Sequence, residues 1–453
     1  MKALTRLLSS FGLLSLGLVH GAEATSLTLG ECLREALVAN HAVLGRGAEN
    51  EAASARARAA TANRRPRLGV QGTALSTTDA LRVRPITANS QAGVFARDTW
   101  QFAGTASVPL YAGGRLVAEQ EAARLLAEAT AGDLAFARQA LALRVVAVFE
   151  DALALRAVVR SLDQSRATLR AQLERIDALL RQQKAAEVDR LRVAVRLARV
   201  DQSAIETRSR LEISQATLAV LMGRDPARTW ELVGELPVPV APRPVASTGV
   251  NERADETAAL ARAAASKKQE DAARAGWRPS VDATAAWGPR SDFDGRENYN
   301  TGFAGVTFSW NVWDLGRTEA RVAEARAATR AREEAAAEAS LQRRLELANA
   351  EAGVRSAAAR IDASRMAVEQ AQESLRIEQR KYDLGQGTIT DVLDAQAAAD
   401  EAESLRARAL ADHAIFLASR DFAAGHIFTS AAATPALQAH PGTRATNVQS
   451  SQP

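Results

Sequence analysis

Two acidic side chains in the second half of the chain have the spacing to act together. Asp391 and Asp394 lie three positions apart in the segment from Gly385 to Gln396, where a turn gives way to a helical pattern. Residues three apart on a helix share a face, so the two carboxylates could attract cations and repel anions. A structural role competes, because Thr388 and Asp391 form a capping box, and a helix dipole favours acids in the first turn. The residues alone leave both roles open.

The sequence offers little support for catalysis. The 5 His residues show no H-x-x-x-H or H-E-x-x-H arrangement, and neither a G-x-S-x-G elbow nor a Gly-rich phosphate loop is present. The single cysteine, Cys32, cannot form an internal disulfide, and we expect it to be a small apolar residue on a short helix. We therefore expect no enzyme activity, no metal site and no cofactor.

The charged residues also argue against a nucleic-acid partner. The chain has 57 Lys and Arg against 53 Asp and Glu, a net charge of +4, and the two signs are mixed along the helical segments. Nucleic-acid-binding proteins instead gather basic residues on one face or in one stretch. We expect no nucleic acid to bind.

A helical hairpin that occurs twice must position the acidic pair. Gly114 begins a pattern that runs almost without Pro or Gly to a turn, after which Asp189 begins a second helix. Gly316 begins a copy that turns and continues through Asp391, and the two spans from glycine to aspartate have the same length. A helix of about 70 residues is about 105 Å long, longer than a compact domain can wrap. The sequence therefore predicts two equal, extended helical hairpins.

The first long helix carries a narrow apolar seam. Apolar residues recur in alternating steps of three and four, which is a heptad pattern interrupted by Arg166. Such a seam buries one stripe against neighbouring helices and leaves the other faces in water, as in a hollow or extended bundle. A solitary coiled-coil rod is the alternative. The seam consists of Leu141, Val145, Val148, Ala152, Leu155, Val159, Leu162, Leu169, Leu173, Ile176 and Leu180.

Alternating strand patterns precede each long helix. They run from Leu68 to Ala74, from Trp100 to Leu110, from Val281 to Trp287 and from Ala304 to Val312, with polar loops at 77–98 and 288–301. Strands of about 10 to 12 residues with one apolar face are typical of a transmembrane β-barrel.

Four strands cannot close a barrel, and a bilayer tolerates no open sheet edge, so the chain must oligomerise. Three copies supply an even number of strands about a threefold axis, which would also gather six carboxylates from Asp391 and Asp394 around one opening. A soluble four-stranded sheet is the alternative, but it leaves Trp100, Phe308 and Trp310 without a core.

The sequence divides into a leader, two repeats and a tail. Residues 1–24 resemble a secretory signal peptide with Lys2, Arg6, an apolar run and a small-residue cleavage site at Ala22 to Ala24. Residues 427–453 lack periodicity, and we expect them to be disordered. Between them we expect a first repeat at 25–235, with strands in 66–111 and helices in 113–224, a Pro-rich segment at 236–251, and a second repeat at 252–426, with strands in 279–313 and helices in 316–426.

This order of strand, Gly-Gly-Arg turn, long helix, turn and Asp-led helix, duplicated after a signal peptide, resembles the TolC family of outer-membrane export channels. The resemblance covers about residues 27–426, and the segment 385–396 is similar to the family's second helical tip. It implies a membrane α+β fold in which a homotrimer closes a 12-stranded β-barrel continuous with a periplasmic α-helical barrel. It also implies an exit duct of a tripartite efflux pump or type I secretion system. Such a duct lies in the outer-membrane lipid of a Gram-negative bacterium and docks with a periplasmic adaptor and an inner-membrane transporter.

The resemblance further implies roles for residues at the two helical tips. Asp391 and Asp394 match the acidic ring at the periplasmic constriction. Tyr382 and Asp189 match a link that holds the resting mouth closed, in which a phenol donates to a carboxylate. As a hypothesis, the ring makes the closed mouth cation-selective.

This sequence departs from the family's second link, which uses an arginine and a threonine where this chain has Gly387 and Val188. We therefore expect fewer bonds to hold the mouth, each worth about 0.5 to 1.5 kcal/mol. Adaptor docking is expected at the two turns, more securely at the second than at the first, which lacks the usual glycine. The residues are Gly385, Gln386, Gly387 and Thr388 in the second turn, and Ala185 and Ala186 in the first.

A second function class stays open. An exported periplasmic coiled-coil scaffold or adaptor would also contain helical hairpins. An adaptor normally has one hairpin framed by small β-domains, whereas here paired strands precede each of two hairpins. The sequence does not indicate whether the cargo is a drug, a metal ion or a protein.

Overall fold

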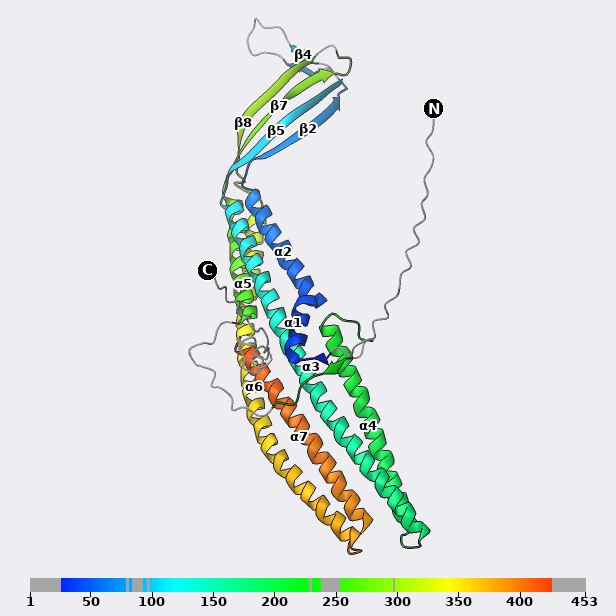
Figure 1. Cartoon of the computed structure of the whole chain (residues 1–453). Coiled ribbons are helices and arrows are strands. Elements are labelled where there is room, and N and C mark those ends of the chain that lie inside the picture. The colour runs from blue at the N-terminus through cyan, green and yellow to red at the C-terminus, as the bar shows by residue number, and fades with distance from the viewer. Residues whose placement is uncertain are drawn as a thin grey trace, which may run out of the picture.

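The computed structural model describes residues 26–78, 81–83, 93–95, 98–227, 230–237, 253–295 and 298–425. A β-sheet lies at one end of the elongated molecule, and long helices run from it to two turns at the other end (Figure 1). The expected signal peptide (1–24) and tail (427–453) lie outside the described residues, as does most of the Pro-rich segment (236–251).

The two helical hairpins have the same dimensions. Helix α3 (Arg115–Arg181) and helix α6 (Arg317–Asp383) each have 67 residues, and α4 (Glu187–Leu221) and α7 (Ile389–Ala423) each have 35. Each long helix follows a glycine in the left-handed conformation, Gly114 with φ 88° and Gly316 with φ 84°. Glycine adopts this conformation without steric cost, which lets the chain turn into each long helix. The equal lengths expected from the sequence are confirmed.

Shorter helices support the long ones between the sheet and the middle of the molecule. Helices α1 (Leu29–Ala39) and α2 (His41–Ala62) pack against α3, and α5 (Ala254–Arg274) lies between α3 and α6 and ends in a short 3-10 turn at Ala275–Trp277. No helix in the described ranges is both long enough and apolar enough to cross a membrane.

The main sheet joins strands from both repeats. Its antiparallel order is β2 (Arg67–Ser76), β5 (Asp98–Ala112), β7 (Ser280–Asp292) and β8 (Asn298–Ser309), so β5 and β7 make the contact between repeats and β2 and β8 are the edges. Within the expected loop 77–98, β3 (Leu81–Val83) pairs with β4 (Gly93–Phe95). In addition, β1 (Ser26–Leu27) pairs in parallel with β6 (Glu231–Leu232).

The register gives the main sheet one apolar face. Val70 pairs with Gly104, Gly104 with Trp287, and Trp287 with Gly302, and directly paired residues lie on the same face. Leu68 lies on this face two positions before Val70, and the two side chains are 84% and 83% exposed. The alternation expected from the sequence is confirmed, and the apolar face is uncovered in the single chain.

Two details of the strands differ from the expectation. Strand β8 ends at Ser309, so Trp310 and Val312 lie beyond it, and the Trp310 Nε1 donates a hydrogen bond to the Trp277 carbonyl at 3.1 Å. In β5, Pro109 and Tyr111 pair with consecutive residues of β7, which makes Leu110 the extra residue of a β-bulge. Simple alternation does not reveal either irregularity.

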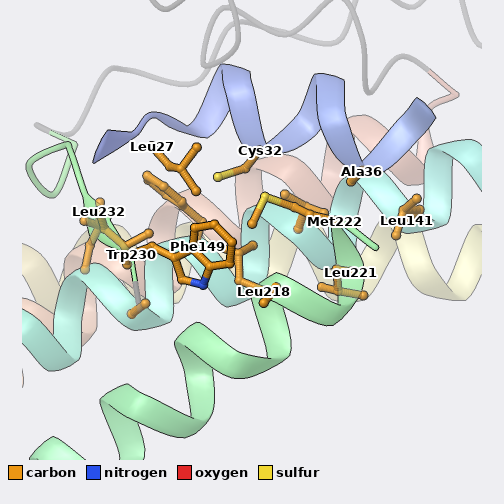
Figure 2. Packing of buried hydrophobic residues seen from close by; sticks show 14 of the residues in the cluster. Leu27, Cys32, Ala36, Leu141, Phe149, Leu218, Leu221, Met222, Trp230 and Leu232 are labelled. Atoms are coloured by element: carbon orange, nitrogen blue, oxygen red, sulfur yellow. The ribbon is translucent and has the colours of Figure 1, made fainter. Parts of the chain in front are cut away.

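A buried apolar cluster fixes the middle of the molecule. Residues of α1, α3, α4 and the segment around β6 meet there, with Cys32, Val145 and Met222 fully buried (Figure 2). Burial raises the pKa of the Cys32 thiol to about 12. The expectation that Cys32 is a small apolar residue on a short helix is confirmed.

The heptad seam of α3 faces other helices along its whole length. None of its residues is exposed, and Val145, Ala152, Leu169 and Ile176 are buried against neighbouring helices. The interruption at Arg166 is compensated, because its guanidinium pairs with Asp201 of α4. The long helix is therefore part of a bundle, which argues against a solitary rod.

Candidate functional site at the hairpin tips

The two turns at the far end from the sheet form the candidate site (Figure 1). In the first turn Gln183 takes the left-handed conformation, with φ 57°, and in the second Gly385 does so, with φ 73°. Both turns therefore contain a left-handed residue. In the first turn this residue is Gln183 instead of the expected glycine. Ala186, Gln386 and the other expected docking residues are exposed, except that Ala185 and Gly387 are half-buried.

An apolar cluster joins the two tips. It combines Leu169 and Ile176 of α3 and Val193 of α4 with Ile389 and Val392 of α7. Ala185 and Tyr382 pack against it. Because Ile176, Val193 and Ile389 are almost completely buried, the two hairpins share one core at their ends.

Asp391 caps helix α7. The Thr388 N–H and hydroxyl donate to its Oδ2 at 3.0 and 2.7 Å, and the Asp391 N–H donates to the Thr388 hydroxyl oxygen at 3.3 Å. These bonds, the hydroxyl bond first, lower the pKa of the Asp391 carboxyl, so it is negatively charged. The side chain is also exposed, so the capping role weighed in the sequence is present, and it leaves the charge open to solvent.

Asp394 lies one turn further along α7 and faces a different neighbour. It is exposed and lines a groove between α4 and α7, opposite Arg192, Arg196 and Arg199. Those arginines were missed in the sequence analysis, although their spacing of four and three along α4 could have identified them as one row. The single chain thus places both acids at the tip, and Asp394 shares its groove with three arginines.

Tyr382 and Asp189 lie near each other without a hydrogen bond among the described residues. Burial raises the pKa of the Tyr382 phenol, and the negative charge of Asp189 raises it further. Asp189 lies 3.5 Å from the Arg192 guanidinium. The proximity expected for a link is present, but the bond itself stays a prediction.

Ion pairs and a hydrogen bond that the sequence analysis missed also connect the hairpins. Arg175 of α3 donates to Asp383 of α6 at 2.7 Å, directly beside Tyr382. Further up, Ser165 of α3 donates to Asp400 of α7 at 2.9 Å, and Arg196 approaches the same carboxylate at 3.3 Å. No local pattern marks these pairs, because each joins residues far apart in the chain.

The site has no arrangement suited to a metal. In the part of the chain that the structure describes, no group of three or more His, Cys, Asp or Glu could hold an ion. The tips therefore offer charge, a shared apolar cluster and exposed turns.

The comparison with protein-family profiles identifies one family. The sequence profile of the outer membrane efflux protein family matches residues 32–224 and 250–419, which is most of both repeats. The comparison with curated proteins found no significant match.

Solved structures have the same fold. VceC from Vibrio cholerae is 21% identical with a TM-score of 0.75, covering 88% of this chain and 96% of its own. CmeC from Campylobacter jejuni is 15% identical with a TM-score of 0.75, covering 90% and 88%. MtrE from Neisseria gonorrhoeae, described in an open state, is 18% identical with a TM-score of 0.73, covering 88% and 89%. At these identities the likeness establishes the fold.

Proposed function

The chain belongs to the family of outer membrane efflux proteins, and from this membership we propose that it is the exit duct of a tripartite efflux pump or type I secretion system. It lies in the outer membrane and extends into the periplasm. The duct passes cargo that an inner-membrane transporter delivers through a periplasmic adaptor. The proposal assigns the chain no catalytic step and no cofactor, and family membership favours it over the alternative, an exported coiled-coil scaffold or adaptor.

One observation in the structure supports this proposal most directly. The apolar face of the sheet, with Leu68, Val70 and Trp287, is exposed at the end of the molecule remote from the hairpin tips (Figure 1). A soluble sheet would cover such a face, whereas the outer surface of a membrane barrel meets lipid. We assign this face to the outer-membrane lipid.

The sheet edges support a homotrimer. Strands β2 and β8 each pair on one side only within the described chain, and a bilayer tolerates no unpaired strand edge. We propose that β2 of one copy pairs with β8 of the next, so that three copies close a 12-stranded barrel. The division into repeats at 25–235 and 252–426, with the segment 236–251 between them, is part of the same proposal.

Planar-bilayer recording of the detergent-extracted protein tests the duct and its constriction together. Wild-type protein should form a stable pore with cation preference. Asp391→Ala combined with Asp394→Ala should reduce that preference, because six carboxylates would leave the threefold axis. If no pore forms and the protein stays in solution without detergent, the duct is refuted, whereas unchanged ion preference in the variant refutes only the acidic constriction.

The gate link has a separate test. Tyr382→Phe removes only a hydroxyl, and Asp189→Ala removes the acceptor. If a Tyr382–Asp189 bond holds the closed mouth, each single variant and the double variant should raise single-channel conductance to a similar level. Arg175→Gln serves as the comparison, since it breaks the neighbouring ion pair with Asp383 and leaves the phenol intact. Unchanged conductance in both Tyr382→Phe and Asp189→Ala would remove this bond from the gate.

The docking turns are tested by export. Aspartate substitutions at Gln386 and Gly387 in the second turn, and at Ala185 and Ala186 in the first, should lower adaptor-dependent export while leaving pore formation intact. We expect the second turn to be more sensitive. If every variant exported at the wild-type rate, the adaptor would contact another surface.

A further inference from the structure

A groove runs along the tip half of the molecule between α4 and α7. Its α4 wall carries the exposed side chains of Leu191 and Val195, and its α7 wall carries Leu393 and Asp394. The volume is about 380 Å³, which falls within the range of about 300 to 1,000 Å³ typical of small-molecule sites.

The groove is rich in cations. Arg192, Arg196 and Arg199 line it, and Asp394 is the one acidic residue among the lining side chains. Arg199 has no ion pair in the described structure, and Arg192 approaches Asp189 only at 3.5 Å. The lining is therefore positively charged, and of its three guanidinium groups that of Arg199 is without an ion pair among the described residues.

Arg196 adds a second indication. One of its terminal nitrogens lies 3.3 Å from Asp400, but its Nε is buried with no hydrogen-bond acceptor within the described ranges. A buried guanidinium N–H normally finds an acceptor. Arg196 thus keeps hydrogen-bonding capacity that the described residues do not use.

We propose that this groove binds a small organic anion with an apolar body. The guanidinium groups of Arg192 and Arg199 bind the anionic group, because charge-assisted bonds to arginine are strong and directional. Val195 and Leu393 contact the apolar body. The α7 wall, from Thr390 to Ala397, is about 10 Å long at about 1.5 Å per residue, which suits a small molecule better than a protein helix.

This inference goes beyond the proposed function, because it assigns the mouth a binding site for amphipathic anions. It rests on the proposed duct only where it places the groove at the mouth of a pore. Binding itself does not require a pore, so the two ideas can fail separately.

Isothermal titration calorimetry of the full-length protein in non-ionic detergent provides the test. The probe is 1-naphthalenesulfonate, and the matched control ligand is 1-naphthylmethylammonium, which has the same rings and the opposite charge. Each titration is corrected with protein-free micelles. We expect the sulfonate to bind and the ammonium ion not to bind.

The double variant Arg192→Gln, Arg199→Gln should weaken sulfonate binding by at least about tenfold, because it removes two charge-assisted contacts. Arg210→Gln is the matched control, since Arg210 lies on the same side of α4 but beyond the groove. It should bind as wild type does.

Four results would overturn the proposal. Equal binding of the two probes would mean that the rings partition without charge recognition. Equal weakening by Arg210→Gln would indicate a diffuse field, and absence of sulfonate binding would mean that another copy of the chain covers the groove. If the double variant lost adaptor-dependent export but kept sulfonate binding, the arginines would serve a protein partner instead. Pore formation, recorded in parallel, reports on the duct independently.

Discussion

Single residues in this chain do more than one task. Asp391 accepts hydrogen bonds from Thr388 that hold the start of α7, and its charge still faces solvent. Because the cap lowers the pKa of the carboxyl, the charge persists at mildly acidic pH. A capping role therefore does not compete with a role in ion selection, as it did when only the sequence was considered.

Glu150 shows the opposite behaviour and makes stability depend on pH. It is 6% exposed on α3, its Oε2 has no partner among the described residues, and burial raises its pKa from 4.5 to about 7. The folded protein therefore favours the protonated form. Burial of the protonated carboxyl therefore leaves the free energy of unfolding highest below about pH 4.5, and this contribution is lost as pH rises through about 7.

We expect Glu150→Gln to remove this dependence. The variant should match wild type near pH 4.5 and unfold at a higher temperature at pH 8, where wild type carries a buried charge. Each tenfold change in proton affinity is worth about 1.4 kcal/mol, so the difference at pH 8 should reach a few kcal/mol. Thermal unfolding followed by circular dichroism from pH 4.5 to 8 measures it. Parallel curves for the two proteins would show that Glu150 is solvated.

At the scale of elements, close helix contacts set the shape of each hairpin. Gly353 lies inside α6, where an added Cβ would come within 2.3 Å of the Phe416 ring of α7. Gly45 lies inside α2 with no atom within 4 Å of the equivalent position. The two glycines have the same helix propensity and opposite surroundings.

Alanine at these two positions should therefore have opposite effects. Alanine is better than glycine in a helix by about 0.5 to 1 kcal/mol, so Gly45→Ala should raise the unfolding temperature slightly. Gly353→Ala should lower it, because overpacking costs about 1 to 3 kcal/mol. Differential scanning calorimetry of both variants tests the pair, and Gly353→Ala with Phe416→Leu should recover part of the loss. A stabilised Gly353→Ala would show that α6 and α7 lie further apart.

The shared tip cluster should hold the two hairpins together more strongly than the exposed ion pair does. Ile176→Ala should cost about 2 to 5 kcal/mol because it opens a cavity, whereas Arg175→Gln should cost about 0.2 to 1 kcal/mol. Hydrogen–deuterium exchange in the first turns of α7 should speed up at least about tenfold in the first variant and much less in the second. Faster exchange in Arg175→Gln than in Ile176→Ala would assign the link to the ion pair.

These elements separate what local sequence reveals from what it hides. The equal hairpins, the Asp391 cap and the burial of Cys32 follow from patterns of a few neighbouring residues, and they were predicted. The Arg175–Asp383 pair and the shared core of Ile176 with Ile389 join different hairpins. No pattern within one helix encodes such a pairing, because it depends on how two helices are placed. The end of β8 at Ser309 was missed since Trp310 and Val312 continue the alternation beyond the strand.

At the scale of the whole molecule, arginine substitutions on the two faces of the sheet test whether one face contacts lipid. Val70 and Gln71 are neighbours on β2, both are exposed, and they point to opposite faces. In a soluble sheet, arginine at either position would be tolerated. In a membrane barrel, arginine on the lipid face costs about 2 to 4 kcal/mol near the bilayer midplane.

Val70→Arg should therefore reduce the amount of folded trimer in the outer membrane, and Gln71→Arg should leave it unchanged. Heat-modifiable migration in gel electrophoresis of outer-membrane fractions quantifies the folded trimer. Equal yields of the two variants would argue that the face we assign to lipid does not meet the bilayer.

The register of the sheet also determines when the chain can finish folding. Strand β5 meets β7 through pairs such as Thr99 with Asp292 and Ala112 with Ser280, which belong to different repeats. Each helical hairpin joins helices that follow each other in the chain and can form early, but the sheet has to close the longer loop that separates these strand residues. Strands β2 and β5 of the first repeat therefore leave the β5 edge unpaired until the second repeat has been synthesised. Assembly in the membrane is consequently a late and slow step, and a chain interrupted after the first repeat should expose that edge to aggregation.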